Sequence, residues 1–435
     1  MVKVDLIVHS AAQLITCASP GGPKRGKSLA DVGLIADGAL AVSNGLIVGL
    51  GSTHEVLADY SGATVIDATG KVICPGFVDP HTHLVYAGER IEEFEMRIQG
   101  TTYLEILEAG GGILSTMRAT REAPVEALVR QSLPRLDKML RLGTTTVEIK
   151  TGYGLDTVNE LKMLRVIEKL YEIHPMDVVP TFLGAHAIPP EYGRRTDDYV
   201  DLVVSDMLPA VDEWYQDSLF SQHGIPLFCD IFCEDGAFDL EQSIKVLQSA
   251  QTYGMGAKIH AEEFSNVGGS SLAVHLRAVS ADHLDVTLDE QIVALASSDV
   301  VGVVLPAVNF NLGSSRFAPA RHLVDSGVVV ALGTDMNPGS APCLSMPMVM
   351  AIGCRYQALL PTETLNAGTI NAAHALCLEH RVGSLEVGKQ ADFLILEAPD
   401  YRYLAYEFGS TCVEAVFKAG TSVQPGHSEL SQIPK

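Results

Sequence analysis

Clusters of basic residues are missing from this sequence. Thirty Lys and Arg residues stand against 53 Asp and Glu, which gives a formal net charge of −23, and the basic residues form no cluster of the kind that follows a phosphate backbone. This argues against nucleic acid and anionic membrane as partners. The acidic residues are spread through the chain rather than gathered in a block, which is typical of solvated surface.

Paired cysteines and long apolar runs are missing as well. The eight cysteines form no CxxC pair and no dense framework, as expected for reduced thiols in a cytoplasm. Asp5 and His9 interrupt any signal-peptide core in the first 16 residues, and no apolar run approaches membrane-spanning length. We therefore expect a soluble, cytoplasmic protein.

The two ends of the chain carry short β-rich segments. With 435 residues and 47% hydrophobic content, the chain can form one large domain plus a smaller one. Residues 1–74 read as hairpins without a helix, separated by Gly, Asp and Asn turns. Hairpin-like sequence returns past about residue 385. We expect 1–74 and 386–435 to pair into one small β domain.

The middle of the chain, residues 75–385, alternates apolar strand-like runs with helical stretches. Nearly continuous apolar strands that alternate with helices are typical of an α/β fold, and eight such units predict a (β/α)₈ TIM-like barrel. Helical periodicity is clear in residues 157–174 and 240–254. The eight expected strands are 72–79, 145–152, 177–184, 227–234, 256–263, 279–285, 301–310 and 328–335.

Polar residues with metal-binding side chains follow four of these strands. His81 and His83 are two residues apart, so on a strand both point the same way, towards the barrel mouth. His260 with Glu263, His283 and Asp335 close the fifth, sixth and eighth strands. Each residue alone is consistent with a core histidine or a turn-forming aspartate. Together, at the ends where such barrels place active sites, they predict a functional site.

The combination of imidazole and carboxylate predicts a metal ion. His81, His83, His260 and Asp335 supply three nitrogens and one oxygen, which leaves room for a water molecule. A buried carboxylate is costly unless it binds a cation, which explains Asp335. Bound to the cation, that water loses a proton near neutrality and becomes a nucleophile.

Several motifs carry a resemblance to a known family. "PGFVDPHTHL", the residues His260, His283 and Asp335 at their strand ends, and "GSLEVGKQADFLIL" resemble the amidohydrolase superfamily, metal-dependent hydrolases on this barrel with a flanking β-sandwich. The segments "AGERIEEF", "AGGGI", "EIKTGYGL", "FLGAHAIPPEY", "DHL" and "TDMNPG" are similar to those of the imidazolonepropionase family, and the likeness spans nearly the whole chain.

This resemblance implies a reaction and a cofactor. The family opens the ring of 4-imidazolone-5-propanoate in histidine breakdown to give N-formimidoyl-L-glutamate, with a single zinc or iron ion. Binuclear relatives add a lysine at the end of strand four, where this chain has none, although Asp230 or Glu234 is not excluded as an extra ligand. The resemblance also implies a homodimer.

The substrate has a ring amide and a propionate arm, and each half needs its own partners. Arg90 can hold a carboxylate by a two-pronged hydrogen bond, and Tyr153, between glycines, can donate to one. His186 faces the mouth from strand three. The further expected substrate contacts are Glu263 and, ranked below Arg90, Tyr103, Asn337, Gly339 and Ser340. We interpret Lys258 and His374 as structural.

Catalytic roles are expected for Glu263, His283 and Asp335. His283 can stabilise the oxyanion and orient the water, Asp335 can take the proton of the water, and Glu263 can return it to the departing nitrogen. Two alternatives remain open. One is a metal-dependent deaminase of a ring such as guanine or cytosine, and the other is a non-catalytic scaffold that kept the barrel.

Overall fold

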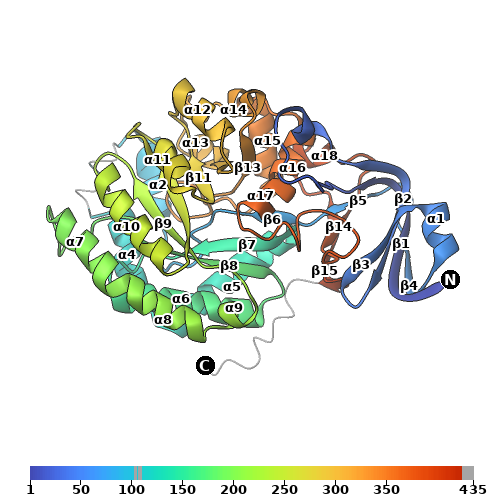
Figure 1. Ribbon diagram of the computed structural model, residues 1–435, viewed down its shortest axis with the longest axis horizontal. Coiled ribbons are helices and arrows are strands. Elements are labelled where there is room, and N and C mark those ends of the chain that lie inside the picture. Colours follow the sequence, from blue (N-terminus) through green and yellow to red (C-terminus); the bar gives the residue numbers. More distant parts are fainter. Residues whose placement is uncertain (102–104, 106–109, 424–435) are drawn as a thin grey trace.

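The computed structural model describes residues 1–101, 105 and 110–423, and it contains two separate sheets of eight strands each. One sheet forms the wall of a barrel surrounded by helices, and the other lies to its side, next to the N-terminus (Figure 1). This arrangement confirms the predicted fold class, a (β/α)₈ barrel with a small β unit built from both ends of the chain.

The barrel strands are parallel and follow one another in chain order. Their side chains are almost entirely buried because helices cover the outside and the opposite wall covers the inside. The strands are β6 (Phe77–Asp79), β7 (Thr144–Lys150), β8 (Asp177–Ala185), β9 (Phe228–Cys233), β10 (Gly256–Ala261), β11 (Ser280–His283), β12 (Val301–Val304) and β13 (Val329–Leu332).

The barrel closes between its first and last strands just beyond their ends. Thr82 forms a parallel bridge with Met336, and the backbone N–H of Asp335 donates to the His81 carbonyl at 3.0 Å. Deeper in the seam, the Asp79 carboxylate accepts from the Thr334 N–H at 3.0 Å and from its hydroxyl at 2.6 Å. The seam therefore fixes the positions of His81 and Asp335 relative to each other.

Helices cover the outside of the barrel (Figure 1). Several follow the strand that precedes them and pack back on the sheet, as in βα units. They are α2 (Ile91–Ile98), α4 (Ile113–Glu122), α5 (Val125–Arg141), α6 (Thr157–Ile173), α7 (Thr196–Leu202), the π-helical turn η2 (Val203–Met207), α8 (Leu208–Asp217), α9 (Leu219–Gln222), α10 (Leu240–Thr252), α11 (Gly269–Leu276), α12 (Asp289–Ala296), α13 (Pro306–Asn311), α14 (Ala320–Ser326), α15 (Met346–Tyr356), α16 (Pro361–Ala367), α17 (Ile370–His374) and α18 (Tyr403–Tyr406). Among the described residues, none of these helices is long and apolar enough to cross a membrane.

The flanking sheet mixes parallel and antiparallel pairs. Both ends of the chain meet in it, since β5 pairs with β14. At the junction with the barrel, the buried Lys418 ammonium pairs with Asp177 at 2.6 Å and with Asp392. The strands are β1 (Val2–Ile15), β2 (Leu34–Ser43), β3 (Leu46–Ser52), β4 (Tyr60–Asp67), β5 (Val72–Pro75), β14 (Phe393–Leu396), β15 (Val413–Lys418) and β16 (Thr421–Val423); the 3₁₀ turn η1 spans Gly26–Ala30.

Two expectations about the N-terminal region are wrong. Residues 72–79 are not one barrel strand, because β5 joins the flanking sheet and only β6, after Gly76, joins the barrel. Residues 1–74 also contain a helix, α1 (Thr53–Asp59), which begins with a reciprocal capping box between Ser52 and Glu55. That Ser-x-x-Glu signature was visible in the sequence.

We expect Thr334→Val to weaken the seam. Valine fills the same space but donates no hydrogen bond, so Asp79 loses its hydroxyl partner, at a cost of about 1.5–3 kcal/mol in the free energy of unfolding. Chemical denaturation followed by circular dichroism in the presence of a chelator measures this change. Thr411→Val, at an exposed position, is the control. Equal midpoints for the two variants would contradict the assignment.

Candidate active site

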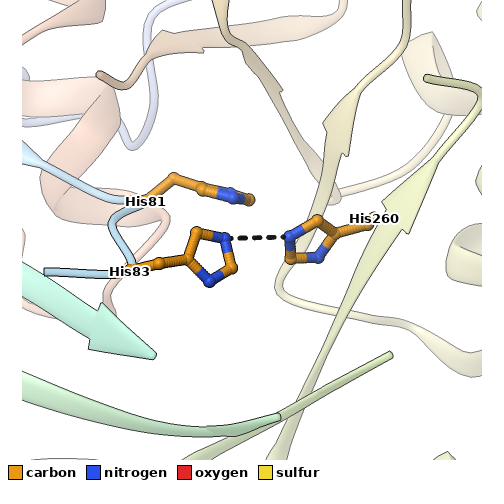
Figure 2. Close-up of side chains that lie close together, drawn as sticks. All are labelled: His81, His83 and His260. Atoms are coloured by element: carbon orange, nitrogen blue, oxygen red, sulfur yellow. Dashed lines mark hydrogen bonds between the residues drawn. The ribbon is translucent and has the colours of Figure 1, made fainter. Parts of the chain in front are cut away.

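The three histidines predicted as ligands converge at the barrel mouth. The Nε2 atoms of His83 and His260 lie 3.4 Å apart, and the ring of His81 lies beside them (Figure 2). One carboxylate oxygen of Asp335, Oδ1, is 3.4 Å from His81 Nε2 and 3.3 Å from His83 Nε2. All four side chains are buried, at 0–3% exposure. The structure therefore gathers the three predicted histidine ligands in one group and places Asp335 against two of them.

The polar atoms that face the centre of this cluster fit a cation. His81 Nε2 and Asp335 Oδ1 are buried without a hydrogen-bond partner. The Nε2 atoms of His83 and His260 face each other, and two imidazole lone pairs at that distance repel unless a proton or a cation lies between them. Nitrogen and oxygen donors of this kind suit zinc and iron. A buried carboxylate with unsatisfied oxygen is likewise stabilised by a cation.

Carboxylates hold two of the imidazoles from behind. Asp282 lies 2.6 Å from His81 Nδ1, and Asp230 lies 3.0 Å from His260 Nδ1. In the carboxylate–histidine pairs of metal sites, a carboxylate in this position holds the ring proton on Nδ1 so that Nε2 can bind the cation. Asp230 thus faces the back of His260 rather than the centre of the cluster. Glu234 instead accepts backbone N–H groups from Phe264 and Ser265.

Two lysines lie beneath the cluster and balance the carboxylates. Lys150 Nζ is 2.8 Å from Asp230, 2.9 Å from Glu148 and 3.7 Å from Asp282. Lys258 Nζ is 3.0 Å from Glu148 and donates to the carbonyls of Pro80 and Ala375. All of these charged side chains are fully buried. The position of Lys258 agrees with the structural role expected for it.

Burial and neighbouring charges set the protonation of the cluster. Burial and Lys150 oppose a charge on His81, but Asp282 and Asp335 outweigh them and raise its pKa to about 9. Burial lowers the pKa of His83 to about 4. Burial would raise the pKa of Asp335, but the neighbouring imidazoles of His81 and His83 hold it well below its usual range. His83 therefore offers a free lone pair, whereas His81 must lose a proton before it binds a cation.

The backbone is strained where the chain leaves three of the barrel strands. Glu262, His283 and Asp335 have φ angles of 54°, 77° and 50°. Side chains other than glycine rarely adopt this left-handed region, and such strain concentrates at functional sites. In β11, Asp282 and His283 would point to opposite faces of a regular strand, and the turn at His283 lets both contribute to the site.

His283 and Glu263 form one side of the site. A ring nitrogen of His283 lies with His81 and Asp335 in a second group that could hold a metal. His283 Nε2 is 3.7 Å from Glu263 and its Nδ1 is 3.9 Å from Asp285. Burial, reinforced by the charges of Asp335 and Asp285, raises the pKa of Glu263 well above its usual value. Burial lowers the pKa of His283 well below its usual value. His283 is therefore a neutral imidazole at neutral pH, and Glu263 keeps its proton to a higher pH than an exposed glutamate does.

The opposite side carries the predicted substrate contacts. The His186 ring stacks on His83, with centroids 4.8 Å apart, and the Tyr153 ring lies 5.5 Å from His186. Burial raises the pKa of Tyr153, so its phenol stays protonated. The nearby charge of Arg90 opposes this rise. Arg90 is held by Glu93, which accepts from its Nε at 2.8 Å and from a terminal nitrogen at 2.7 Å.

The loop after Asp335 is braced by its own side chains. The amide oxygen of Asn337 accepts the N–H groups of Gly339 and Ser340 at 2.8 Å, and its NH₂ donates to the Ser340 hydroxyl. Gly339 gives Arg90 room, because a Cβ there would lie 2.1 Å from a guanidinium nitrogen. The carbonyl of Gly339 accepts from Arg97 at 2.9 Å. The predicted loop therefore lies directly against Arg90.

The sequence interpretation missed the residues behind the ligands. Asp282, Asp230, Lys150 and Glu148 were not assigned supporting roles, although charged residues inside apolar strands are a signal that each has a partner. Tyr103 lies outside the described residues. His374, on α17, lies 3.8 Å from Glu379 and is not part of either imidazole group in the described chain.

Comparison with known proteins places this geometry in a family. The model of the amidohydrolase family matches residues 234–423. An imidazolonepropionase from Chloroflexus aggregans is 53% identical over 97% of this chain and 99% of its own length. One from Herpetosiphon aurantiacus is 50% identical over 98% of each. The chain belongs to the imidazolonepropionase family. This member of a hydrolase family therefore has a group of histidines and an aspartate that could hold a metal ion.

Solved structures share the fold at much lower identity. An adenosine deaminase from Xanthomonas campestris with bound zinc is 20% identical, and it covers 97% of this chain and 93% of its own with a TM-score of 0.68. At this identity the likeness shows the architecture alone. The imidazolonepropionase relatives, rather than this deaminase, match the chain closely in sequence.

We expect Asp282→Asn to weaken metal binding about 10–100-fold, because the carboxylate that orients His81 becomes a neutral amide. Competition with a chelator during zinc titration measures the affinity. Asp285→Asn is the matched control: burial raises the pKa of Asp285 to about 8, so at pH 7 this change removes little charge. Wild-type zinc affinity in Asp282→Asn would contradict the assignment.

Proposed function

We propose that this protein hydrolyses the ring amide of 4-imidazolone-5-propanoate to N-formimidoyl-L-glutamate, a step of histidine degradation. The observation that carries the proposal is one buried site with two chemically different sides. The imidazoles and Asp335 form the part that can hold a cation, and Tyr153, whose ring lies 6.0 Å from that of His83 and whose pKa is raised by burial against the opposing charge of Arg90, belongs to the part that would bind the arm. Membership of the imidazolonepropionase family supports the same reaction.

The proposal includes one zinc or iron ion per subunit, held by His81, His83, His260 and Asp335. Such an ion polarises the carbonyl of the substrate and makes a bound water acidic. The proposal also includes a homodimer, which the family resemblance implies, and a cytoplasmic location, which the cysteine pattern and the N-terminal sequence predict.

The substrate would span the two sides of the site. Its planar ring would lie over the imidazoles, beside His186, and its propionate arm would reach Arg90 and Tyr153. Glu93 occupies two nitrogens of the Arg90 guanidinium, and the remaining terminal nitrogen lies against Gly339. That nitrogen and the Tyr153 phenol are donors that a carboxylate accepts well.

The protonation of the side chains supports a division of the proton transfers among Asp335, His283 and Glu263. Asp335 is a carboxylate and can accept a proton from the attacking water. Neutral His283 can donate to the oxyanion and orient that water. The water oxygen bonds to the ring carbonyl carbon, and the bond from that carbon to the ring nitrogen breaks. Glu263, whose pKa is raised well above its usual value by burial, can deliver a proton to the departing nitrogen.

The test is hydrolysis of freshly generated 4-imidazolone-5-propanoate by the purified protein, followed by the loss of ring absorbance. We expect turnover that a chelator abolishes and that added zinc or iron restores, because the imidazoles alone cannot activate water enough. The matched control substrates are guanine and cytosine, which lack a carboxylate arm. Ammonia release from either base, without ring opening of the imidazolone, would favour the deaminase alternative instead.

We expect Glu263→Gln to lower kcat about 10²–10⁴-fold with unchanged metal content, because glutamine cannot donate the proton. Because burial raises the pKa of Glu263, the acid form persists to a higher pH than in a free glutamate and is lost as pH rises through that pKa. The alkaline fall in kcat should therefore disappear in the variant. Glu262→Gln, at the neighbouring buried carboxyl, should keep that fall. Full turnover in Glu263→Gln would remove it from the mechanism.

A further inference from the structure

The loop that carries Tyr153 is held by a buried carboxylate that the reaction does not use. Glu160, in the first turn of α6, is completely buried. It accepts the backbone N–H of Gly152 at 3.1 Å and those of Gly154 and Leu155 at 2.8 Å. A carboxylate with several backbone donors holds them more firmly than a neutral acceptor does. The residues on both sides of Tyr153 are therefore fixed to α6.

Arg121 holds the carbonyl groups of the same loop. Its Nε donates to the Gly154 carbonyl at 2.6 Å, and a terminal nitrogen donates to the Leu155 carbonyl at 3.1 Å. Its guanidinium is itself anchored by Asp156 at 3.2 Å and by Glu191 at 2.7 Å. The peptide groups of the loop are thus clamped at both their N–H and their C=O ends.

The clamped loop orients two side chains. Tyr153 is one, and the other is His186, whose Nδ1 lies 3.1 Å from the Gly152 carbonyl. Gly152 has a φ of 101°, and a Cβ there would lie 2.7 Å from His186 Nδ1. At Gly154 a Cβ would lie 2.5 Å from the Glu160 N–H nitrogen. The loop has no room to shift without moving Tyr153 and His186 together.

We propose that Glu160 and Arg121 are positioning residues that set the preference of this enzyme for a substrate with a carboxylate arm. They act through Tyr153 and His186, and the inference rests on the proposed function for the identity of that substrate. Because the clamp lies on the arm side of the site, it governs how tightly the arm is bound. The clamped loop itself carries neither a predicted ligand nor Glu263, so we expect the chemical step to depend on the clamp much less than binding of the arm does.

Glu160→Gln tests this role. The amide keeps the size of the side chain but replaces one acceptor oxygen with a donor that faces backbone N–H groups. We expect KM for 4-imidazolone-5-propanoate to rise about tenfold, with kcat within about twofold of wild type and unchanged zinc content. Binding of imidazole-4-propionate, measured calorimetrically, should weaken by a similar factor. Binding of 4-methylimidazole, which lacks the arm, should not change.

Glu168→Gln is the matched control. Glu168 lies on the same helix, and its carboxylate also accepts a backbone N–H, that of Leu219 at 2.8 Å, but on a different loop. The KM of the Glu168→Gln variant, and its preference for imidazole-4-propionate over 4-methylimidazole, should equal those of wild type. If Glu160→Gln does not fold, Arg121→Met opens the clamp from the carbonyl side and should show the same split between KM and kcat.

The outcomes separate the two proposals. An inactive wild-type protein overturns the proposed function. An active wild type, with clamp variants that fold and retain both the wild-type KM and the wild-type preference for imidazole-4-propionate, overturns the positioning role alone. A loss of kcat without a change in KM also overturns it, because the clamp would then support the fold or the chemistry rather than recognition of the arm.

Discussion

The buried ammonium of Lys150 is the contact on which the geometry of the site depends. It lies within 3.7 Å of Asp230, Glu148 and Asp282, in an interior where an unbalanced charge would be very costly. Two of these carboxylates orient the imidazoles of His81 and His260. One network therefore balances the buried charges inside the barrel and orients His81 and His260 at its mouth. A shift of the strands would disturb both the charge balance and the orientation of these imidazoles.

Above this layer the chain departs from regular geometry in a consistent way. The strands end in left-handed backbone at Glu262, His283 and Asp335, and each departure redirects a side chain that a regular strand would point elsewhere. Buried carboxylates then hold the loops: Glu160 gathers the loop of Tyr153, and Glu234 gathers the residues after Glu263. Loops at a barrel rim must be rigid to position the side chains of the site. Such buried carboxylates, and not packing alone, make them rigid.

The division of the site into two sides explains how one architecture hosts different reactions. The barrel architecture is shared with a distant adenosine deaminase from Xanthomonas campestris. The arm side is built from the loops after β6, β7 and β13, which carry Arg90, Tyr153 and Gly339. Since loops change more readily than strands, recognition of a substrate can diverge while the fold persists.

The sequence by itself determined the barrel, the β unit from both chain ends and the gathering of His81, His83, His260 and Asp335, because apolar periodicity and strand ends are local patterns. Only the tertiary structure decided that residues 72–79 divide between two sheets and that Asp282 pairs with His81, 201 residues away. Such pairings depend on which strands become neighbours and on which oppositely charged side chains then pair in the interior. Neither is encoded in any short stretch of chain, so they emerge only once the barrel closes.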